Sequence, residues 1–129
     1  MKPNTHLDIN EALCGTIIKI EKDYCLIRLN ATENMKVDNS GLVHGGFVFG
    51  AADYAAMLAV NHPNVVLGAA DVQFLKPMKV GETVLAEAKV VQSKGKKKQV
   101  SVTGKIEKKE IFKGTFTCFV LDRHVLETP

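Results

Sequence analysis

One carboxylate lies inside a long apolar stretch of this sequence, close to two glycines whose backbone could bind an anion. The stretch, residues 41–63, reads GLVHGGFVFGAADYAAMLAVNHP, and its carboxylate is Asp53. A carboxylate that is desolvated without partners costs several kcal/mol, so Asp53 needs a compensating role. His44, Gly45 and Gly46 precede it. The two glycines offer backbone N–H groups with no side chain in front of them, at the positive end of a predicted helix, where an oxyanion could bind.

The stretch predicts one long helix that is buried on all sides. Apart from Gly50 and Asp53, positions 47–60 hold only Phe, Val, Ala, Tyr, Met and Leu, which is typical of a helix enclosed by protein. Residues 61–63, Asn-His-Pro, are expected to end it.

Within one helix, Asp53 would lie about two turns, roughly 10 Å, from the glycines. One chain therefore cannot easily bring both to the same atom, whereas a second copy could place its Asp53 beside the glycines of the first. The alternative is a structural role, in which Asp53 faces water or accepts a hydrogen bond from a strand amide.

The remaining sequence predicts a sheet around this helix. Residues 12–20 and 22–30 alternate in polarity around a charged turn, which indicates a hairpin, and residues 32–40 are polar enough for a loop. Residues 65–77 form an apolar run, and residues 83–92, 99–108 and 110–121 alternate like half-buried strands. The turns are expected at 81–82, 94–95 and 109–110. The fold class is therefore α+β, with five to six mostly antiparallel strands and one long helix in a single domain, residues 1–129.

Composition restricts the class of protein further. Of 129 residues, 46% are hydrophobic and 24% charged, with a formal net charge of +3. No stretch approaches the roughly 18 apolar residues of a membrane span, and the first ten residues hold no apolar signal block, so we expect a cytoplasmic protein without membrane contact. Neither the three cysteines nor the remaining histidines have metal-ligand spacing, so we expect no metal. The cysteines are expected to be core thiols, and the histidines to be exposed or locally bonded. The cysteines are Cys14, Cys25 and Cys118; the histidines are His6, His62 and His124.

The segment SKGKKKQ, residues 93–99, concentrates positive charge around one glycine. Most such runs are solvated turns, but this one could also form an anion site. It lacks interleaved aromatic residues, and the chain contains no known nucleic-acid motif, so we expect no nucleic-acid partner.

The sequence resembles the hotdog-fold acyl-CoA thioesterases, in particular the branch that includes the phenylacetic-acid-pathway thioesterases. The resemblance is carried by His44–Gly45–Gly46 with Asp53 nine residues after the histidine, and by DVQFLKPMKVGETV, residues 71–84. It extends from about Leu13 to Leu121. It implies an antiparallel sheet curled around a central helix, a homodimer that is often doubled to a homotetramer, and a hydrolase site shared between two subunits.

The resemblance also implies roles for individual residues. Asp53 corresponds to the catalytic carboxylate, acting as general base on water or as nucleophile on the thioester carbonyl. Gly45, and with it Gly46, would donate an N–H to the oxyanion, and His44 would orient the entrance loop or the water. The family's asparagine six residues before the histidine corresponds to Asp38, and Asn39 follows it as the candidate for positioning the water.

Further candidates concern the substrate. The apolar side chains expected to line an acyl tunnel are Phe47, Phe49, Tyr54, Met57, Leu67 and Phe74. The lysines expected near the coenzyme A phosphates are Lys94, Lys96, Lys97 and Lys98. No cofactor is implied beyond coenzyme A as part of the substrate. Residues 67–70 lack the hydroxyl that often assists catalysis in the family.

Two functions therefore stay open. The first is an acyl-CoA thioesterase, acting on acyl-CoA or on an acyl-carrier thioester. The second is a non-catalytic module that binds acyl-CoA or acyl-carrier protein, favoured by the missing hydroxyl and the shifted asparagine. A hotdog dehydratase or hydratase fits less well, because such enzymes resemble different patterns. A cysteine nucleophile is disfavoured, because no cysteine lies at a helix N-terminus.

Overall fold

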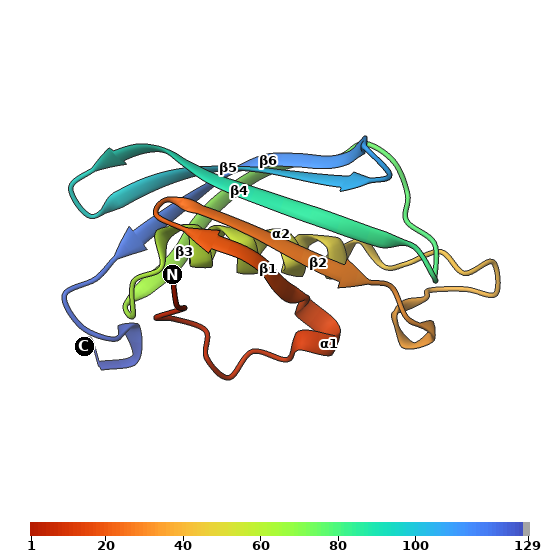
Figure 1. Cartoon of the computed structure of the whole chain (residues 1–129), viewed down its shortest axis with the longest axis horizontal. Helices are drawn as coiled ribbons and strands as arrows, with labels where there is room; N and C mark the ends of the chain where they lie inside the picture. The colour runs from red at the N-terminus through yellow and green to blue at the C-terminus, as the bar shows by residue number, and fades with distance from the viewer. Residues whose placement is uncertain (128–129) are drawn as a thin grey trace.

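The computed structural model describes residues 1–127, and one curved sheet lies across one long helix in it (Figure 1). The strands are β1 (Thr16–Glu21), β2 (Tyr24–Asn30), β3 (Val65–Phe74), β4 (Thr83–Lys94), β5 (Lys97–Ile106) and β6 (Lys109–Val120). The helices are α1 (Glu11–Cys14) and α2 (Gly45–Val60), and the short 3-10 turns are η1 (Glu33–Met35) and η2 (Val125–Glu127). The strand order is β1-β2-β4-β5-β6-β3, with antiparallel neighbours throughout. This confirms the predicted α+β hotdog fold. The last two residues of the predicted domain, 128 and 129, lie outside the described residues.

Helix α2 is shorter than the apolar stretch that predicted it. It begins at Gly45, and the preceding residues are extended, with Leu42 and Val43 in isolated bridges to neighbouring segments. At its other end Asn61 adopts a left-handed conformation, φ 53°, and donates its N–H to the carbonyl of Met57 at 2.8 Å. This is a common helix stop that asparagine tolerates well, and it precedes the proline expected to end the helix. With 16 residues, α2 is shorter than a membrane span requires, and no other helix within residues 1–127 qualifies.

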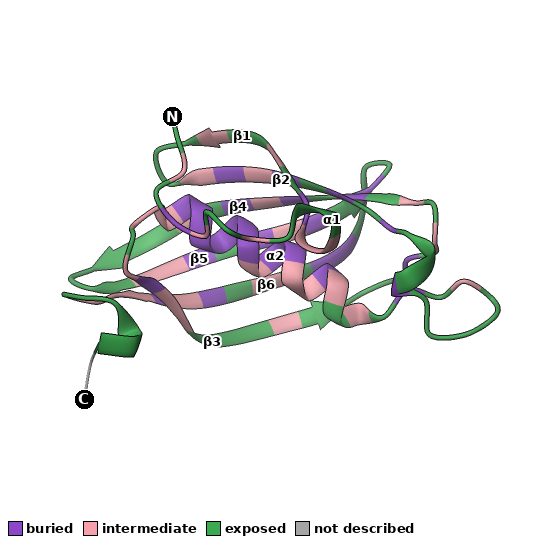
Figure 2. Ribbon diagram, turned by 90° about the horizontal axis from the view of Figure 1, so that it is seen from below, coloured by how far each residue is buried: buried purple, intermediate pink, exposed green. Residues whose placement is uncertain are grey.

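The core lies between α2 and the concave face of the sheet. Alternate residues of the strands point toward α2, as Cys25, Ile27 and Leu29 of β2 do, each at most 1% exposed. Figure 2 shows the buried turns of α2 lying across the strands. The small residues of the helix, mainly alanines, allow the sheet to approach it closely.

Three local predictions differ from the structure by a few residues. The turn expected at 94–95 lies at 95–96, between β4 and β5. Residues 11–14 form the single turn α1, capped by the Asn10 side chain, so the first strand begins only at Thr16. The last hairpin turns at Glu107 and Lys108, not at 109–110, and both residues have positive φ, 49° and 72°. Positive φ at both central residues is the geometry of the tight hairpin turn that matches strand twist.

One side of the molecule is left open, contrary to the predicted enclosure of α2 on all sides. Strand β3 forms an edge of the sheet, next to β6 alone. In its register with β6, Ala70 pairs with Phe116 and Phe74 pairs with Phe112. Phe112 and Phe116 are fully buried against α2, so their partners Ala70 and Phe74 lie on the same concave face of the sheet. Ala70 and Phe74 are nevertheless exposed. Part of the concave face is therefore uncovered, beside the N-terminal half of α2 (Figure 2).

Candidate active site

Asp53 lies on the stripe of α2 that the rest of the chain leaves partly open. Gly46, Gly50 and Asp53 are three to four residues apart and so share one helix face. None of the three is fully buried, and a Cβ placed on Gly50 would meet no atom within 4 Å. The stripe therefore has room for a ligand or a second subunit against it.

One oxygen of Asp53 has no partner. Its Oδ1 atom is buried and accepts no hydrogen bond, and no other side-chain polar atom among residues 1–127 is in this situation. Burial raises the pKa of this carboxyl to about 6. The predicted structural alternative, in which a strand amide satisfies Asp53, therefore has no support from the hydrogen bonds. A carboxyl of this pKa can exchange a proton near neutral pH, as a general base requires.

Two thiols lie within electrostatic reach of Asp53. Burial, and then the Asp53 carboxylate, raise the pKa of Cys14 in α1 and that of Cys118 in β6, the latter to about 12. Both thiols are therefore held protonated, which agrees with their predicted role as packing residues and not as nucleophiles.

The start of α2 differs from the prediction in one contact. His44 is the N-cap, and its Nδ1 accepts the N–H of Gly46 at 2.7 Å. The Gly46 N–H is therefore already occupied, whereas no acceptor for the Gly45 N–H is found within residues 1–127. Of the two predicted oxyanion donors, Gly45 is the one available to a ligand.

A hollow of about 270 Å³ lies in front of Gly45. Phe74 forms part of its wall: a Cβ on Gly45 would meet the Phe74 ring at 3.3 Å, so only glycine leaves this space open. The other lining side chains are mostly apolar and come from the segment before α2, its first turn, the β3–β4 connection and β6: Val43, Val48, Leu75, Lys76, Pro77, Met78 and Ile111. Of these lining residues only Phe74 was predicted from the sequence, although residues 75–78 lie in the segment that carries the family resemblance.

The remaining predicted tunnel residues separate into two groups. Phe47 and Phe49 are partly exposed on α2; Phe47 makes an edge-on ring contact with His44, and Phe49 packs on Phe116. Tyr54 and Met57 are 4% and 1% exposed and belong to the core of this chain. Leu67 on β3 is partly buried and so belongs with the first group.

The loop before α2 projects away from the body of the molecule, beyond the N-terminal end of the helix (Figures 1 and 2). In it, Asp38 Oδ1 accepts the N–H of Ser40 at 2.9 Å and its hydroxyl at 2.5 Å. The hydrogen bonds from Ser40 lower the pKa of Asp38, which is therefore ionised at neutral pH. Asn39 is exposed beside it.

The predicted lysines form the end of the β4–β5 hairpin, here called the lysine hairpin: Lys94, Lys96, Lys97 and Lys98. Lys94 and Lys97 are direct cross-strand partners, a like-charge pairing that disfavours the hairpin. Lys96 forms an ion pair with Asp122 at 2.8 Å. A hollow of about 280 Å³ joins Lys96 and Lys98 to Val60 and His62, so the lysine hairpin lies at the C-terminal end of α2, opposite Gly45 (Figure 1).

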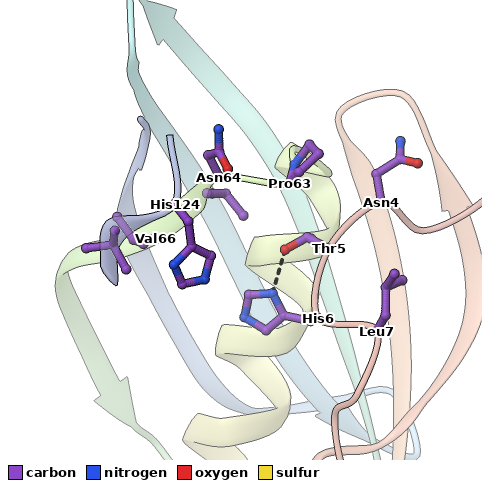
Figure 3. A pocket seen from close by; sticks show the side chains of 10 residues that line it. Asn4, Thr5, His6, Leu7, Pro63, Asn64, Val66 and His124 are labelled. Carbon is purple, nitrogen blue, oxygen red and sulfur yellow. Dashed lines mark hydrogen bonds between the residues drawn. The ribbon is translucent and has the colours of Figure 1, made fainter. Parts of the chain in front are cut away.

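Two other hollows lie away from Asp53. One of about 410 Å³ is at the C-terminal end of α2, between the two terminal segments, with His6 and His124 in its wall (Figure 3). The larger, about 650 Å³, lies on the outer face of β1, β2, β4 and β5. The other three histidines make local hydrogen bonds, as expected. His6 Nδ1 bonds to the Thr5 hydroxyl. In His62 and in His124, Nδ1 accepts the backbone N–H of the residue two positions later.

Comparison with known proteins places the chain in a family. Residues 40–112, more than half of the chain, match the Thioesterase superfamily. The chain is 51% identical over 123 residues to methylthioribose-1-phosphate isomerase of Aquifex aeolicus (strain VF5), covering 95% of this chain and 27% of that protein. It is 30% identical over 96 residues to transcription factor FapR of Caldanaerobacter subterraneus subsp. tengcongensis, covering 74% of this chain and 48% of FapR. The chain thus spans less than half the length of either relative.

Solved structures agree with the family match. Protein PH1136 from Pyrococcus horikoshii is 49% identical with a TM-score of 0.97, covering 98% of both chains. Protein smu.793 from Streptococcus mutans UA159, bound to acetyl CoA, is 26% identical with a TM-score of 0.80, covering 93% of this chain and 99% of the other. A variant of the phenylacetic acid degradation protein PaaI from Thermus thermophilus is 26% identical with a TM-score of 0.78, covering 86% and 96%. The chain described here belongs to the Thioesterase superfamily.

Proposed function

We propose that this protein is an acyl-CoA thioesterase, which hydrolyses a thioester to a carboxylic acid and free coenzyme A. The observation that carries the proposal is the unpartnered, buried Oδ1 of Asp53 on an open helix face. A buried carboxylate without a partner reduces stability, so it is expected where it performs chemistry. The acetyl CoA bound to the related smu.793 supports an acyl-CoA as the ligand class.

The reaction would need two groups. The carbonyl oxygen of the thioester accepts the N–H of Gly45, which stabilises the negative charge that develops there, worth about 3 kcal/mol per donor. Asp53 removes a proton from the attacking water, or attacks the carbonyl carbon itself and is released by water. In either case the carbon–sulfur bond breaks and the coenzyme A sulfur leaves, taking a proton. No metal or further cofactor enters this scheme.

Both groups act on one carbonyl only if two subunits meet. Within one α2, Gly45 and Asp53 are separated by about 12 Å along the axis, because eight residues rise 1.5 Å each. The open stripe of α2 and the uncovered concave side of β3 offer a surface for a second copy. We therefore propose a homodimer, or a dimer of such dimers, in which Asp53 of one subunit serves Gly45 of the partner subunit.

A second candidate function is a non-catalytic module that binds acyl-CoA or an acyl-carrier protein. Two observations favour it. Transcription factor FapR is related at 30% identity and is named as a regulator. In addition, residues 67–70 of β3 offer no hydroxyl to assist Asp53.

One experiment separates the two functions. Hydrolysis of a panel of aryl and fatty acyl-CoAs is measured for the wild type and for Asp53→Asn, which keeps the side-chain shape and removes its charge and basicity. The thioesterase proposal expects Asp53→Asn to reduce kcat by roughly a hundredfold or more with nearly unchanged acyl-CoA affinity. Unchanged turnover in Asp53→Asn would exclude Asp53 as the catalytic group. Wild-type turnover at background, with micromolar binding, would instead support the binding module.

A further inference from the structure

The structure separates two predicted parts of one ligand site. The nucleotide phosphates of coenzyme A were expected at the lysine hairpin, and the thioester carbonyl at Gly45. The hollow that joins Lys96 and Lys98 to Val60 places the lysine hairpin at the far end of α2. From Gly45 to Val60, α2 measures about 22 Å along its axis. One subunit's lysine hairpin is therefore remote from its own Gly45 (Figure 1).

Two-fold symmetry changes this relationship. For Asp53 of the partner subunit to reach Gly45, the two-fold axis must run across α2. An axis parallel to the helix would leave these residues offset by about 12 Å. A crosswise axis meets α2 midway between Gly45 and Asp53, near Phe49. Phe49 and the adjacent Gly50 are only partly buried, so the required crossing point coincides with an open part of the helix.

The same axis also fixes where the far end of the partner's helix lies. Val60 is 11 residues beyond Phe49, and Gly45 is four residues before it. The C-terminal end of the partner's α2 therefore lies about 10 Å beyond Gly45, measured along the helix axis. The partner's lysine hairpin accompanies that end, because Lys96 and Lys98 share a hollow with Val60. A crosswise two-fold thus brings the partner's lysine hairpin toward Gly45 and leaves the subunit's own about 22 Å or more away.

We propose that the lysine hairpin acts in trans: the subunit that supplies Asp53 to a site also supplies the lysines that hold the nucleotide phosphates of the same thioester. This inference rests on the shared site of the proposed function. The cross-strand pair Lys94–Lys97 is consistent with it, because like charges held opposite each other destabilise the free hairpin and attract a polyanion. Each ligand is then held by Gly45 of one subunit and by Asp53 and the lysine hairpin of the partner.

The test uses mixed dimers, purified through two different tags after co-expression. One subunit carries Gly45→Val, which fills the hollow in front of the Gly45 N–H. The other carries glutamine in place of all four lysines of the lysine hairpin. The probe is a non-hydrolysable acyl-CoA thioether, and calorimetry gives its affinity and stoichiometry. If the Gly45→Val variant does not fold, Gly45→Ala replaces it. The alanine Cβ would lie 3.3 Å from the Phe74 ring and so would already narrow the hollow.

Action in trans predicts one binding site of wild-type affinity per mixed dimer, because the open Gly45 faces the intact lysine hairpin of the blocked subunit. Action within one subunit predicts only weak binding, like that of the lysine-variant homodimer, and would overturn the inference. Two results with homodimers would also overturn it: wild-type binding by Gly45→Val, or a monomer that binds the thioether. The readout is binding, so a wild type without hydrolysis would remove the proposed enzyme function and leave this test valid.

Discussion

His44 Nδ1 accepts the backbone N–H of Gly46 at 2.7 Å, so the histidine of the His-Gly-Gly motif caps the helix that carries Asp53. A side-chain cap satisfies one of the N–H groups that have no partner at a helix start. The contact also decides which glycine is available to a ligand, because it occupies Gly46 and leaves Gly45.

The first prediction concerns this cap. Replacing His44 with Ala should lower the free energy of unfolding by about 1 kcal/mol, the usual cost of a lost N-cap. His44→Asn is the matched control, because asparagine is a favoured cap and should retain most of that stability. Denaturant unfolding of the three proteins measures the difference. Equal stabilities for the alanine and asparagine variants would show that the cap contributes nothing.

A second prediction follows from the burial of Asp53. Its pKa is raised to about 6, so the folded protein retains a proton that the unfolded chain releases near pH 4. Wild-type stability relative to Asp53→Asn should therefore be greatest below about pH 4, fall as the pH rises to about 6, and then stay level. The total fall should not exceed about 3 kcal/mol. Unfolding curves of both proteins from pH 4 to 8 test this, and a constant difference would refute the raised pKa.

The same carboxyl predicts the pH dependence of hydrolysis. An ionised Asp53 is needed as base or nucleophile, so kcat/KM should rise with pH below about 6 and level off above it. His6 also titrates in this region, with a pKa that burial lowers from 6.5. His6→Gln should keep the acidic limb if Asp53 causes it. A limb that disappears in His6→Gln would assign the profile to the histidine.

Assembly can be tested at the exposed concave side of β3. Ala70 lies beside the buried Phe116 and is uncovered in the single chain. If a second copy covers it, Ala70→Arg places a charge in the interface, and the dimer and the hydrolytic activity should be lost together. Ser101→Arg, on the outer face of β5, should change neither. Sedimentation equilibrium at micromolar concentration gives the mass, and an active monomer of any variant would contradict a shared site.

The sequence predicts the fold well where local chemistry decides it. Alternating polarity located the strands, and the residues 61–63 marked the end of α2, because a left-handed asparagine and a proline both stop a helix. The sequence also singled out Asp53, because one carboxylate among apolar residues is costly wherever the chain folds. These features depend on neighbours along the chain.

The features that could not be predicted depend on strand order and on side-chain contacts. The lysine hairpin and Gly45 lie at opposite ends of α2 because the turn between β4 and β5 lies beside Val60, which alternation alone does not reveal. The sequence predicted core for the open stripe of α2 as well, because the helix is apolar around nearly its whole circumference. The contact between His44 and Gly46 depends on one rotamer, so no spacing rule predicts it.

The last prediction concerns the lysine hairpin. Replacing Lys94, Lys96, Lys97 and Lys98 with glutamine should weaken coenzyme A binding roughly tenfold at low salt and flatten its salt dependence, because exposed charges attract phosphates over a screening length of about 10 Å at 0.1 M salt. Affinity for a pantetheine thioester without the nucleotide should hardly change. The matched control removes the same charge elsewhere, at four other exposed lysines: Lys105, Lys108, Lys109 and Lys113. Calorimetric titrations at several salt concentrations compare the two variants. An equal loss of affinity in both would show that net charge alone attracts the ligand, and an equal loss for both ligands would show that the lysines act on folding or on the acyl pocket.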